Sequence, residues 1–318
     1  MEKNVQKKST RDAYGETLVE LGRREPRIVV VDADLPSSTR TAWFAKEFPE
    51  RFFNVGVAEQ NLYAVAAGLA TCGKISFAST FAVFATERAL NQIRQSIAYT
   101  ELNVKIVTSH SGFTASGDGG SHQTLIDISL MRSLPNMTVI VPADSVQTKQ
   151  AVVAAAAYHG PVYIRLGKTE VPFVFQQDSP FLIGKAITLR EGEDVTVFAT
   201  GIMLARALEA AERASRAGIR VQIVNIHTIK PIDRAAVVDA ARKTGAVVTV
   251  EEHSVIGGLG SAVAEVLAEE YPVIMRMIGV RDAFGESGSD DGLYEKHGLT
   301  SLNIERTIQD VMNAKKRS

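Results

Sequence analysis

The stretch Phe53-Asn-Val-Gly-Val-Ala-Glu-Gln-Asn-Leu-Tyr-Ala-Val-Ala-Ala-Gly-Leu-Ala70 changes at its middle from an extended pattern to a helical one. One face of the predicted helix is packed, because apolar side chains recur at helical spacing: Leu62, Val65, Ala66 and Leu69. Glu59 lies where the two patterns meet. A carboxylate there can offset the helix dipole, or it can be a functional acid in an apolar wall, where burial disfavours the charged form. Position alone favours the dipole role, so the choice depends on the rest of the chain.

Short apolar segments alternate with helical segments along the first half of the chain. The predicted strands cover residues 27–32, 75–78, 104–108, 137–141 and 162–166. The predicted helices cover residues 9–20, 62–71, 84–99, 124–132 and 145–158. Continuously apolar strands that alternate with helices are typical of a parallel sheet covered on both faces. We therefore predict an open, doubly wound α/β domain.

A second alternating set follows a break in the pattern. Residues 171–184 contain Pro172, Pro180 and a polar Gln-Gln-Asp run without periodicity, which is typical of a linker. Predicted strands at 195–200, 220–225, 247–251 and 273–278 then alternate with predicted helices at 204–217, 233–243 and 260–270. The 318 residues therefore divide into an α/β domain at 1–172, a linker at 173–185 and a smaller α/β domain at 186–318.

The composition excludes several classes of protein. Hydrophobic residues make up 45% and charged residues 22% of the chain, as in ordinary globular proteins. A net charge of −1 gives no general attraction for nucleic acid or anionic membranes, and no apolar run is long enough to span a membrane. The first ten residues lack the apolar core of a signal peptide, and the one cysteine, Cys72, cannot form an intramolecular disulfide. We expect a cytoplasmic protein.

An aromatic pair follows the second predicted strand. In residues 77–88, F-A-S-T-F-A-V-F-A-T-E-R, Phe81 and Phe84 are three residues apart and can share one helix face. Phenyl rings at this spacing are most often core residues. They can also form a wall for a planar ligand ring.

A polar loop follows the strand that ends at Thr108. Residues 109–123, S-H-S-G-F-T-A-S-G-D-G-G-S-H-Q, include His110, Asp118 and His122. The loop lies at the carboxyl edge of the predicted sheet, where open α/β folds bind ligands. It is either a solvated surface loop or a pocket for a polyol or phosphate, because imidazoles and a carboxylate can bind hydroxyls and move protons near neutral pH.

Three segments together resemble the carboxyl-terminal half of transketolase. They are Val57-Ala-Glu-Gln, Ser79-Thr-Phe-Ala-Val-Phe, and Gly117-Asp-Gly-Gly-Ser-His-Gln followed by Leu134-Pro-Asn. Their order and spacing match, and the similarity runs from about Thr10 to the end of the chain. The resemblance implies a thiamine diphosphate pyrimidine-binding domain followed by a transketolase C-terminal domain. It also implies transfer of a two-carbon ketol unit from a ketose phosphate to an aldose phosphate, as in pentose phosphate metabolism.

The resemblance implies roles for the residues singled out above. Glu59 resembles the glutamate that binds the ring nitrogen of the thiamine aminopyrimidine, and Phe81 and Phe84 resemble the aromatic wall of that pocket. His110 and His122 resemble family histidines that contact substrate and assist proton transfer. One departure is Glu87, which stands where many transketolases have a tyrosine.

Further residues are similar to the substrate contacts of the family. Asp118 resembles the aspartate that binds the hydroxyl next to the reacting carbon. Arg11, Ser37 and Arg165 align with residues that hold the sugar phosphate, a role that suits the planar guanidinium group. Ser38 is an alternative to Ser37, and either serine can belong to a plain turn.

The chain lacks the Gly-Asp-Gly…Asn motif that holds the metal and the diphosphate in thiamine enzymes. Gly117-Asp-Gly119 matches its start, but Asn136 comes too early for the motif. No metal ligand is therefore predicted here. The resemblance implies a split enzyme, in which an N-terminal subunit binds the diphosphate and a Mg²⁺ or Ca²⁺ ion and shares the cofactor in a two-plus-two heterotetramer.

Three alternatives remain at the level of the sequence. The beta subunit of a 2-oxoacid dehydrogenase has a similar length and the same two domains. A fragment of a 1-deoxyxylulose-5-phosphate synthase shares the domain order. A non-catalytic binding partner could keep the same fold. Such a protein is expected to have lost Glu59 or the loop histidines His110 and His122, and all three are present here.

Two segments of the second domain imitate functional motifs. Gly257-Gly-Leu-Gly260 resembles a dinucleotide loop, but Val263 stands where the third glycine belongs, which favours a tight strand-to-helix turn. Glu251-Glu-His253 resembles a metal cluster, but consecutive strand residues point in different directions. We predict a sheet-edge segment there, and a surface loop at residues 281–288.

Overall fold

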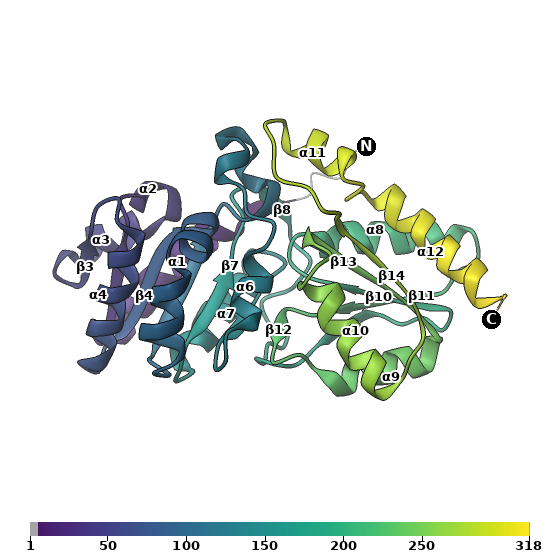
Figure 1. The fold of residues 1–318 in the computed structure, drawn as a ribbon, viewed down its shortest axis with the longest axis horizontal. Helices are drawn as coiled ribbons and strands as arrows, with labels where there is room; N and C mark the ends of the chain where they lie inside the picture. The colour runs from purple at the N-terminus through teal and green to yellow at the C-terminus, as the bar shows by residue number, and fades with distance from the viewer. Residues whose placement is uncertain (1–5, 318) are drawn as a thin grey trace.

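Seven strands form the sheet of the first domain in the computed structural model, which describes residues 6–317. Figure 1 shows this sheet beside that of the second domain. Across the sheet the strands are β12 (Thr228–Lys230), β6 (Thr138–Ile140), β7 (Val162–Arg165), β5 (Val104–Ser109), β4 (Ile75–Phe81), β2 (Ile28–Asp32) and β3 (Phe52–Asn54). All neighbours are parallel except β12, which is antiparallel to β6. The central strands are buried, as their continuous apolar sequences predict.

Helices cover both faces of this sheet. Alternate residues of a strand point to opposite faces, so Val30 packs with α1 (Thr10–Arg24), α3 (Thr41–Glu47) and α7 (Ser145–Ala157). Val31 instead packs with α4 (Glu59–Thr71) and α6 (Asp127–Ser133). Between β4 and β5 the chain forms η2 (Phe84–Arg88), α5 (Leu90–Gln92) and η3 (Ile93–Ala98), with π-helical turns where one regular helix was predicted.

The second domain has a five-stranded sheet. Its order is β14 (Ile274–Val280), β13 (Ala246–Ser254), β10 (Val195–Ala199), β11 (Val221–Asn225) and β9 (Ile187–Arg190), with β9 antiparallel and the rest parallel. Four helices pack against it: α8 (Met203–Arg216), α9 (Arg234–Thr244), α10 (Leu259–Glu270) and α12 (Ser301–Lys315). A short helix, α11 (Asp290–Lys296), contacts the first domain. The predicted pair of α/β domains is therefore confirmed.

Short elements, together with the long C-terminal helix α12, account for most differences from the prediction. The pair β1 (Lys7–Ser9) and β8 (Glu170–Pro172), the edge strands β9 and β12, and the helices α2 (Pro36–Thr39), α3, α11 and α12 were not predicted. Between β8 and β9, residues 173–186 form neither helix nor strand. The polypeptide returns to the first domain at β12. This strand lies in the second half of the chain and forms one edge of the first sheet (Figure 1). The residues at which the two domains begin and end, 1–172 and 186–318, stay predictions.

Among the described residues, none of the helices combines the length and apolar character needed to cross a membrane.

Candidate active site

The predicted site residues come from neighbouring ends of parallel elements. β4 ends at Phe81 and pairs there with Ser109, the last residue of β5, so His110 follows at the same edge of the sheet. Glu59 is the first residue of α4, and Arg11 lies in the first turn of α1. Side chains that are distant in sequence therefore meet at one carboxyl edge, as the doubly wound fold predicts.

Glu59 is buried at the start of α4, with only 3% of its surface exposed. Its Oε2 lies 3.3 Å from a guanidinium nitrogen of Arg88, a residue not singled out from the sequence. The Arg88 side chain is 57% exposed and also lies over the Phe84 ring, 5.4 Å from its centroid. An ion pair with so exposed a partner is weak, so another ligand can compete for Glu59. No hydrogen bond from residues 6–317 reaches the other carboxylate oxygen, Oε1.

Four aromatic side chains form a cluster, which Arg88 connects to Glu59 through its contact with Phe84. The rings of Phe81 and Phe84 are nearly parallel, 5.8 Å apart with an interplanar angle of 9°. The ring of His110 stacks on Phe81 at 3.7 Å. His122 meets Phe84 edge-on at 5.4 Å and Phe81 at 6.4 Å. The structure thus brings the predicted aromatic wall and both loop histidines into one cluster, which core packing alone does not require.

His110 is held in a strained, buried position. Its φ of 57° lies in the left-handed region, which few non-glycine residues adopt. Its Nδ1 lies 2.9 Å from the Ser109 hydroxyl and its Nε2 lies 3.5 Å from an Arg11 nitrogen. Burial, followed by the charges of Arg11 and Lys168, lowers the pKa of His110 to about 3. The imidazole is therefore neutral at physiological pH.

Arg11 is a half-buried cation that forms no ion pair with a carboxylate of residues 6–317. One of its nitrogens donates to the carbonyl of Ser38 at 2.9 Å, and its buried Nε has no hydrogen-bond partner among the described residues. Burial and the charge of Arg40 lower the pKa of Arg11 from its usual value. Ser37 is exposed, and its carbonyl accepts from Arg40 at 2.8 Å. Arg11 therefore contacts the backbone of Ser38, and the choice between the hydroxyls of Ser37 and Ser38 stays a prediction.

Asp118 and His122 lie on the rim of the same loop. Asp118 is exposed and forms an ion pair with Lys168 at 3.2 Å. Lys168 follows the end of β7 and was not singled out from the sequence. His122 lies in η5 (Gly120–His122), with its Nδ1 3.1 Å from the Ser121 hydroxyl. Both side chains stay accessible to a ligand, as substrate contacts require.

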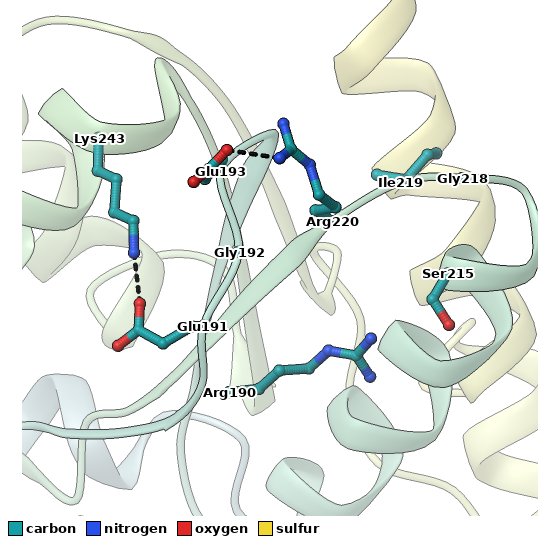
Figure 2. Close-up of a pocket in the computed structure, with 9 residues that line it drawn as sticks. All are labelled: Arg190, Glu191, Gly192, Glu193, Ser215, Gly218, Ile219, Arg220 and Lys243. Carbon is teal, nitrogen blue, oxygen red and sulfur yellow. Dashed lines mark hydrogen bonds and ion pairs between the residues drawn. The ribbon is translucent and has the colours of Figure 1, made fainter.

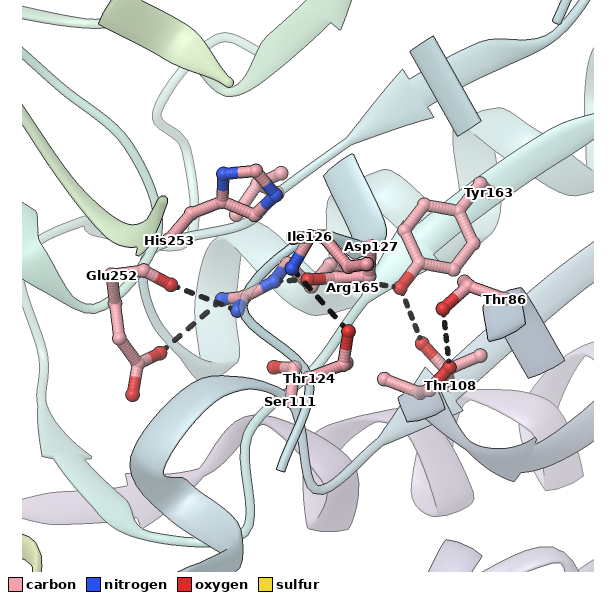
Figure 3. Close-up of polar contacts among 12 residues, drawn as sticks. Thr86, Thr108, Ser111, Thr124, Ile126, Asp127, Tyr163, Arg165, Glu252 and His253 are labelled. Carbon is pink, nitrogen blue, oxygen red and sulfur yellow. Dashed lines mark hydrogen bonds and ion pairs between the residues drawn. The ribbon is translucent and has the colours of Figure 1, made fainter. Parts of the chain in front are cut away.

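Arg165 does not join this group, so its predicted contact with phosphate needs correction. Its side chain is 5% exposed, and its Nε donates to Asp127 at 2.8 Å. Its other two nitrogens donate to the carboxylate of Glu252 at 3.2 Å and to the Glu252 carbonyl at 2.9 Å (Figure 3). Because the guanidinium group is already paired with two buried carboxylates, it is not free to bind a sugar phosphate. Arg165 instead connects the two domains.

The Glu251–His253 segment is also different from the prediction. It is not a sheet edge, because β13 lies between β14 and β10 and all three side chains are buried. Glu251 accepts the backbone N–H groups of Leu259 and Gly260 at 2.7 and 2.8 Å, at the start of α10. Burial raises the pKa of Glu251 to about 7. The glycine run before α10 therefore forms the expected strand-to-helix turn, organised by a buried carboxyl group.

Two hollows in the surface differ in their relation to these residues. One, of about 530 Å³, lies beside the loop and is lined by residues of both domains, among them Val83, Glu87, Ser121, Gln123 and Phe284. Phe284 is 96% exposed there, in the predicted surface loop. The other lies in the second domain, where Lys243 pairs with Glu191 and Arg220 with Glu193 (Figure 2). None of the predicted site residues lines this second hollow.

Residues 6–317 contain no group of three or more His, Cys, Asp or Glu side chains placed to hold a metal ion.

Comparison with known proteins identifies the family. Residues 6–174 match the transketolase pyrimidine-binding domain, and residues 184–304 match the transketolase C-terminal domain. The chain belongs to the transketolase family. It is 50% identical over 309 residues to a proposed transketolase C-terminal section from Methanocaldococcus jannaschii, and the match covers 96% of each chain.

Two further relatives are split enzymes or subunits. A 6-deoxy-6-sulfo-D-fructose transketolase subunit from Clostridium sp. (strain MSTE9) is 48% identical over 305 residues, which cover 96% of this chain and 95% of the relative. A solved split-gene transketolase, an inactive β4 tetramer, is 57% identical with a TM-score of 0.91 and covers 96% of this chain and 99% of that one. Fold, domain order and relatives are those of the C-terminal section of a split transketolase.

The residues of the first domain fit the aminopyrimidine of thiamine diphosphate. A ring nitrogen needs one carboxyl group, and Glu59 has an oxygen that no described residue occupies. A flat ring needs a flat apolar neighbour, and the near-parallel rings of Phe81 and Phe84 supply one. This donor set suits the organic ring of the cofactor and provides nothing for its diphosphate.

Proposed function

We propose that this chain is the C-terminal subunit of a two-component transketolase, active only with an N-terminal subunit. The observation that carries the proposal is the grouping of Glu59, Phe81 and Phe84 with His110 and His122 at one edge of the sheet. The N-terminal subunit would bind the diphosphate and a Mg²⁺ or Ca²⁺ ion. The solved split-gene transketolase is an inactive β4 tetramer, which supports the need for a partner, and we infer a two-plus-two heterotetramer.

Glu59 would hold the aminopyrimidine by a hydrogen bond to its ring nitrogen, and Phe81 and Phe84 would form the wall beside the ring. When bound, thiamine diphosphate supplies a nucleophilic carbon that attacks the ketose carbonyl. Arg88 would leave Glu59 as the ring arrives, because its half-exposed side chain is free to turn toward water. Glu87 is exposed one residue earlier and would lie outside the ring contact.

Arg11 would bind the anionic end of the sugar, since it forms no direct ion pair with a carboxylate of the described residues. A phosphate or a sulfonate fits this site equally, and one relative is named for a sulfonated sugar. Asp118 would bind the hydroxyl next to the reacting carbon. His122 would carry the proton of the sugar hydroxyl during cleavage of the carbon–carbon bond. His110, whose pKa is lowered to about 3, would be a weak base and would serve more readily as a hydrogen-bonding partner.

We place the enzyme in the cytoplasm, since Cys72 is exposed and unpaired, as is common in reducing compartments. Ordinary pentose phosphates are one substrate class that the anion site allows, and sulfonated ketoses are another.

Reconstitution with an N-terminal transketolase subunit tests the assignment. The mixture is assayed with xylulose 5-phosphate or 6-deoxy-6-sulfofructose as donor and an aldose phosphate as acceptor. We expect ketol transfer only when both subunits, thiamine diphosphate and a divalent metal are present. Activity on pyruvate plus glyceraldehyde 3-phosphate would instead favour a 1-deoxyxylulose-5-phosphate synthase, and acyl transfer to lipoamide would favour a 2-oxoacid dehydrogenase. Tight, magnesium-dependent binding of the cofactor to this chain alone, by calorimetry, would contradict the split site.

Substitution Glu59→Gln tests the proton partner directly. The amide keeps the size of the side chain and cannot share a carboxyl proton, so turnover of the complex should fall about 10²–10⁴-fold. Glu50→Gln, at an exposed position of the first domain, is the matched control and should leave turnover unchanged. Calorimetry with the complex should show weaker cofactor binding for Glu59→Gln alone. Turnover near that of the control would show that Glu59 has another role.

A further inference from the structure

We propose that the C-terminal domain holds the substrate loop in place, with Asp290 and Gln123 as positioning residues for Asp118 and His122. Here the substrate loop means residues 110–123. The proposal deepens the proposed function, because it rests on that loop being where the sugar binds. It also gives the C-terminal domain a task, although that domain supplies none of the predicted site residues.

Asp290 provides the first anchor. It is the first residue of α11, which contacts the substrate loop across the domain boundary (Figure 1). Its Oδ1 accepts a hydrogen bond from the hydroxyl of Ser116, two residues before Asp118. Its Oδ2 accepts a hydrogen bond from Thr169, which adjoins Lys168. One carboxylate therefore connects the loop to the segment that carries Lys168, the ion-pair partner of Asp118.

Gln123 provides the second anchor, directly after His122. Its amide nitrogen donates to the carbonyl of Glu286 at 2.9 Å, and its amide oxygen accepts from the backbone N–H of Glu286 at 3.1 Å. Gln123 is buried, with 6% of its surface exposed. A pair of reciprocal hydrogen bonds between a buried amide and a backbone fixes both position and orientation.

Glycines allow the close approach that these bonds need. A methyl group at Gly285 would lie 2.3 Å from Oε1 of Gln123, closer than non-bonded atoms can approach. A methyl group at Gly120 would lie 2.5 Å from the carbonyl oxygen of Gly285. The backbones of the two domains therefore touch beside His122. Side chains larger than hydrogen would separate them.

Residues at the base of the loop also pack against the C-terminal domain. The backbone N–H of Phe113 donates to Glu252 at 2.9 Å, and the Phe113 ring stacks on His297 at 4.8 Å. Phe113 and Leu125 pack in the core of the second domain. Between the anchors at Ser116 and Gln123 the rim of the loop is exposed, and Gly119 adopts a φ of 85°. The anchors on either side therefore set where Asp118 and His122 lie.

Asp290 and Asp291 give a matched pair of variants. Both lie in the first turn of α11, so each substitution by alanine removes the same charge from the same helix end. The Asp291 side chain is 93% exposed, and its one ion pair among residues 6–317 is a long contact of 3.8 Å with Arg206. Asp290→Asn is a conservative variant, because an amide still offers an acceptor for one hydroxyl and a donor for the other.

Hydrogen exchange of the isolated chain measures the anchor without any activity. The reporters are amides of the loop that are bonded within it: Gly119 to Ser116, His122 to Gly119 and Gln123 to Gly120. Loss of two hydrogen bonds to a carboxylate in Asp290→Ala should speed their exchange about tenfold or more. Asp291→Ala should match the wild type, and Asp290→Asn should recover most of the protection. Equal exchange in Asp290→Ala and Asp291→Ala would overturn the proposal.

Kinetics of the reconstituted complex test the consequence for the substrate. Asp290→Ala should raise the KM for the sugar about tenfold and also lower kcat, because the anchors hold both the sugar contact Asp118 and the proton carrier His122. Gly285→Ala, which displaces Gln123 by steric contact, should do the same. An unchanged KM together with faster exchange would show that the anchors do not position the substrate contacts. If the wild-type complex transfers no ketol group, the proposed function fails, and the exchange results still decide whether the loop is anchored.

Discussion

Replacing Arg165 by methionine removes the central cation between the domains and leaves most of its aliphatic stem. The change deletes three hydrogen bonds, one to Asp127 and two to Glu252. Both carboxylates stay buried, with Asp127 0% and Glu252 3% exposed. Removing one member of a buried ion pair costs about 3–5 kcal/mol, because the remaining charges lack compensation.

The remaining partners place the expected loss near the lower end of that range. Asp127 still accepts from the Tyr163 hydroxyl at 2.7 Å. Glu252 still accepts from the backbone of Phe113 at 2.9 Å and from the Tyr294 hydroxyl at 2.8 Å. We therefore expect Arg165→Met to lower the free energy of unfolding by about 3 kcal/mol at pH 8.

The loss should shrink as the pH falls. Burial already raises the pKa of Glu252, and the charge of Arg165 opposes that rise. Without the arginine the pKa of Glu252 in the folded state rises further above its unfolded value. A folded-state pKa that is raised in this way stabilises the protein at low pH, and the stabilisation is lost as pH rises. The difference between wild type and variant is therefore larger at pH 8 than at pH 5.

Urea unfolding of the isolated chain at both pH values measures this difference. Circular dichroism and tyrosine fluorescence should give the same transition before a free energy is extracted. Arg213→Met is the control, because its partner Glu305 lies at 2.7 Å but the arginine side chain is 39% exposed. Such a pair contributes about 0–1 kcal/mol. If Arg165→Met costs no more than Arg213→Met at pH 8, the buried network does not hold the domains together.

Two further predictions follow from perturbed groups elsewhere. The pKa of Glu251 is raised to about 7 in the folded state, above its value in the unfolded chain. The protonated carboxyl therefore stabilises the fold at a pH below the unfolded-state pKa, and this stabilisation is lost as the pH rises through 7. Urea unfolding should therefore show that the free energy of unfolding of Glu251→Gln falls below that of the wild type by about 1–3 kcal/mol more at pH 5 than at pH 8. Equal differences at the two pH values would refute the raised pKa of Glu251. The lowered pKa of His110, about 3, keeps its ring neutral, so its nitrogen resonances should not move between pH 5 and pH 8, and a midpoint near 6.5 would refute it.

The sequence predicted the parts of the fold that depend on local patterns. Continuous apolar runs marked the central strands, and helical spacing marked α4 and α8, because burial of one face leaves a regular pattern. The strands β1, β9 and β12 have three or four residues each and pair with partners far away in the chain. Strands this short carry too little pattern to be recognised, and their pairing is decided by the tertiary fold.

The candidate site was predictable where residues lie at the ends of recognisable strands. Phe81 is the last residue of β4 and His110 follows β5, so their meeting could be expected from a parallel sheet. Arg88 was missed because its contact with Glu59 depends on the π-helical turn of η2. Arg165 was misplaced because the end of β7 meets the end of β13, and nothing in the sequence indicates how the two sheets pack. Domain packing of this kind is a long-range property.

The strand β12 has a consequence for how this polypeptide can be divided. A fragment ending at residue 174 would keep six strands of the first sheet but lose the neighbour of β6. Its Val141 N–H would also lose the carbonyl of His227, 2.7 Å away. A bare, apolar edge of this kind recruits strands from other molecules, so such a fragment should aggregate edge to edge. The residues that match the pyrimidine-binding domain, 6–174, therefore leave out one strand of that domain's own sheet, which the chain supplies from beyond the domain match.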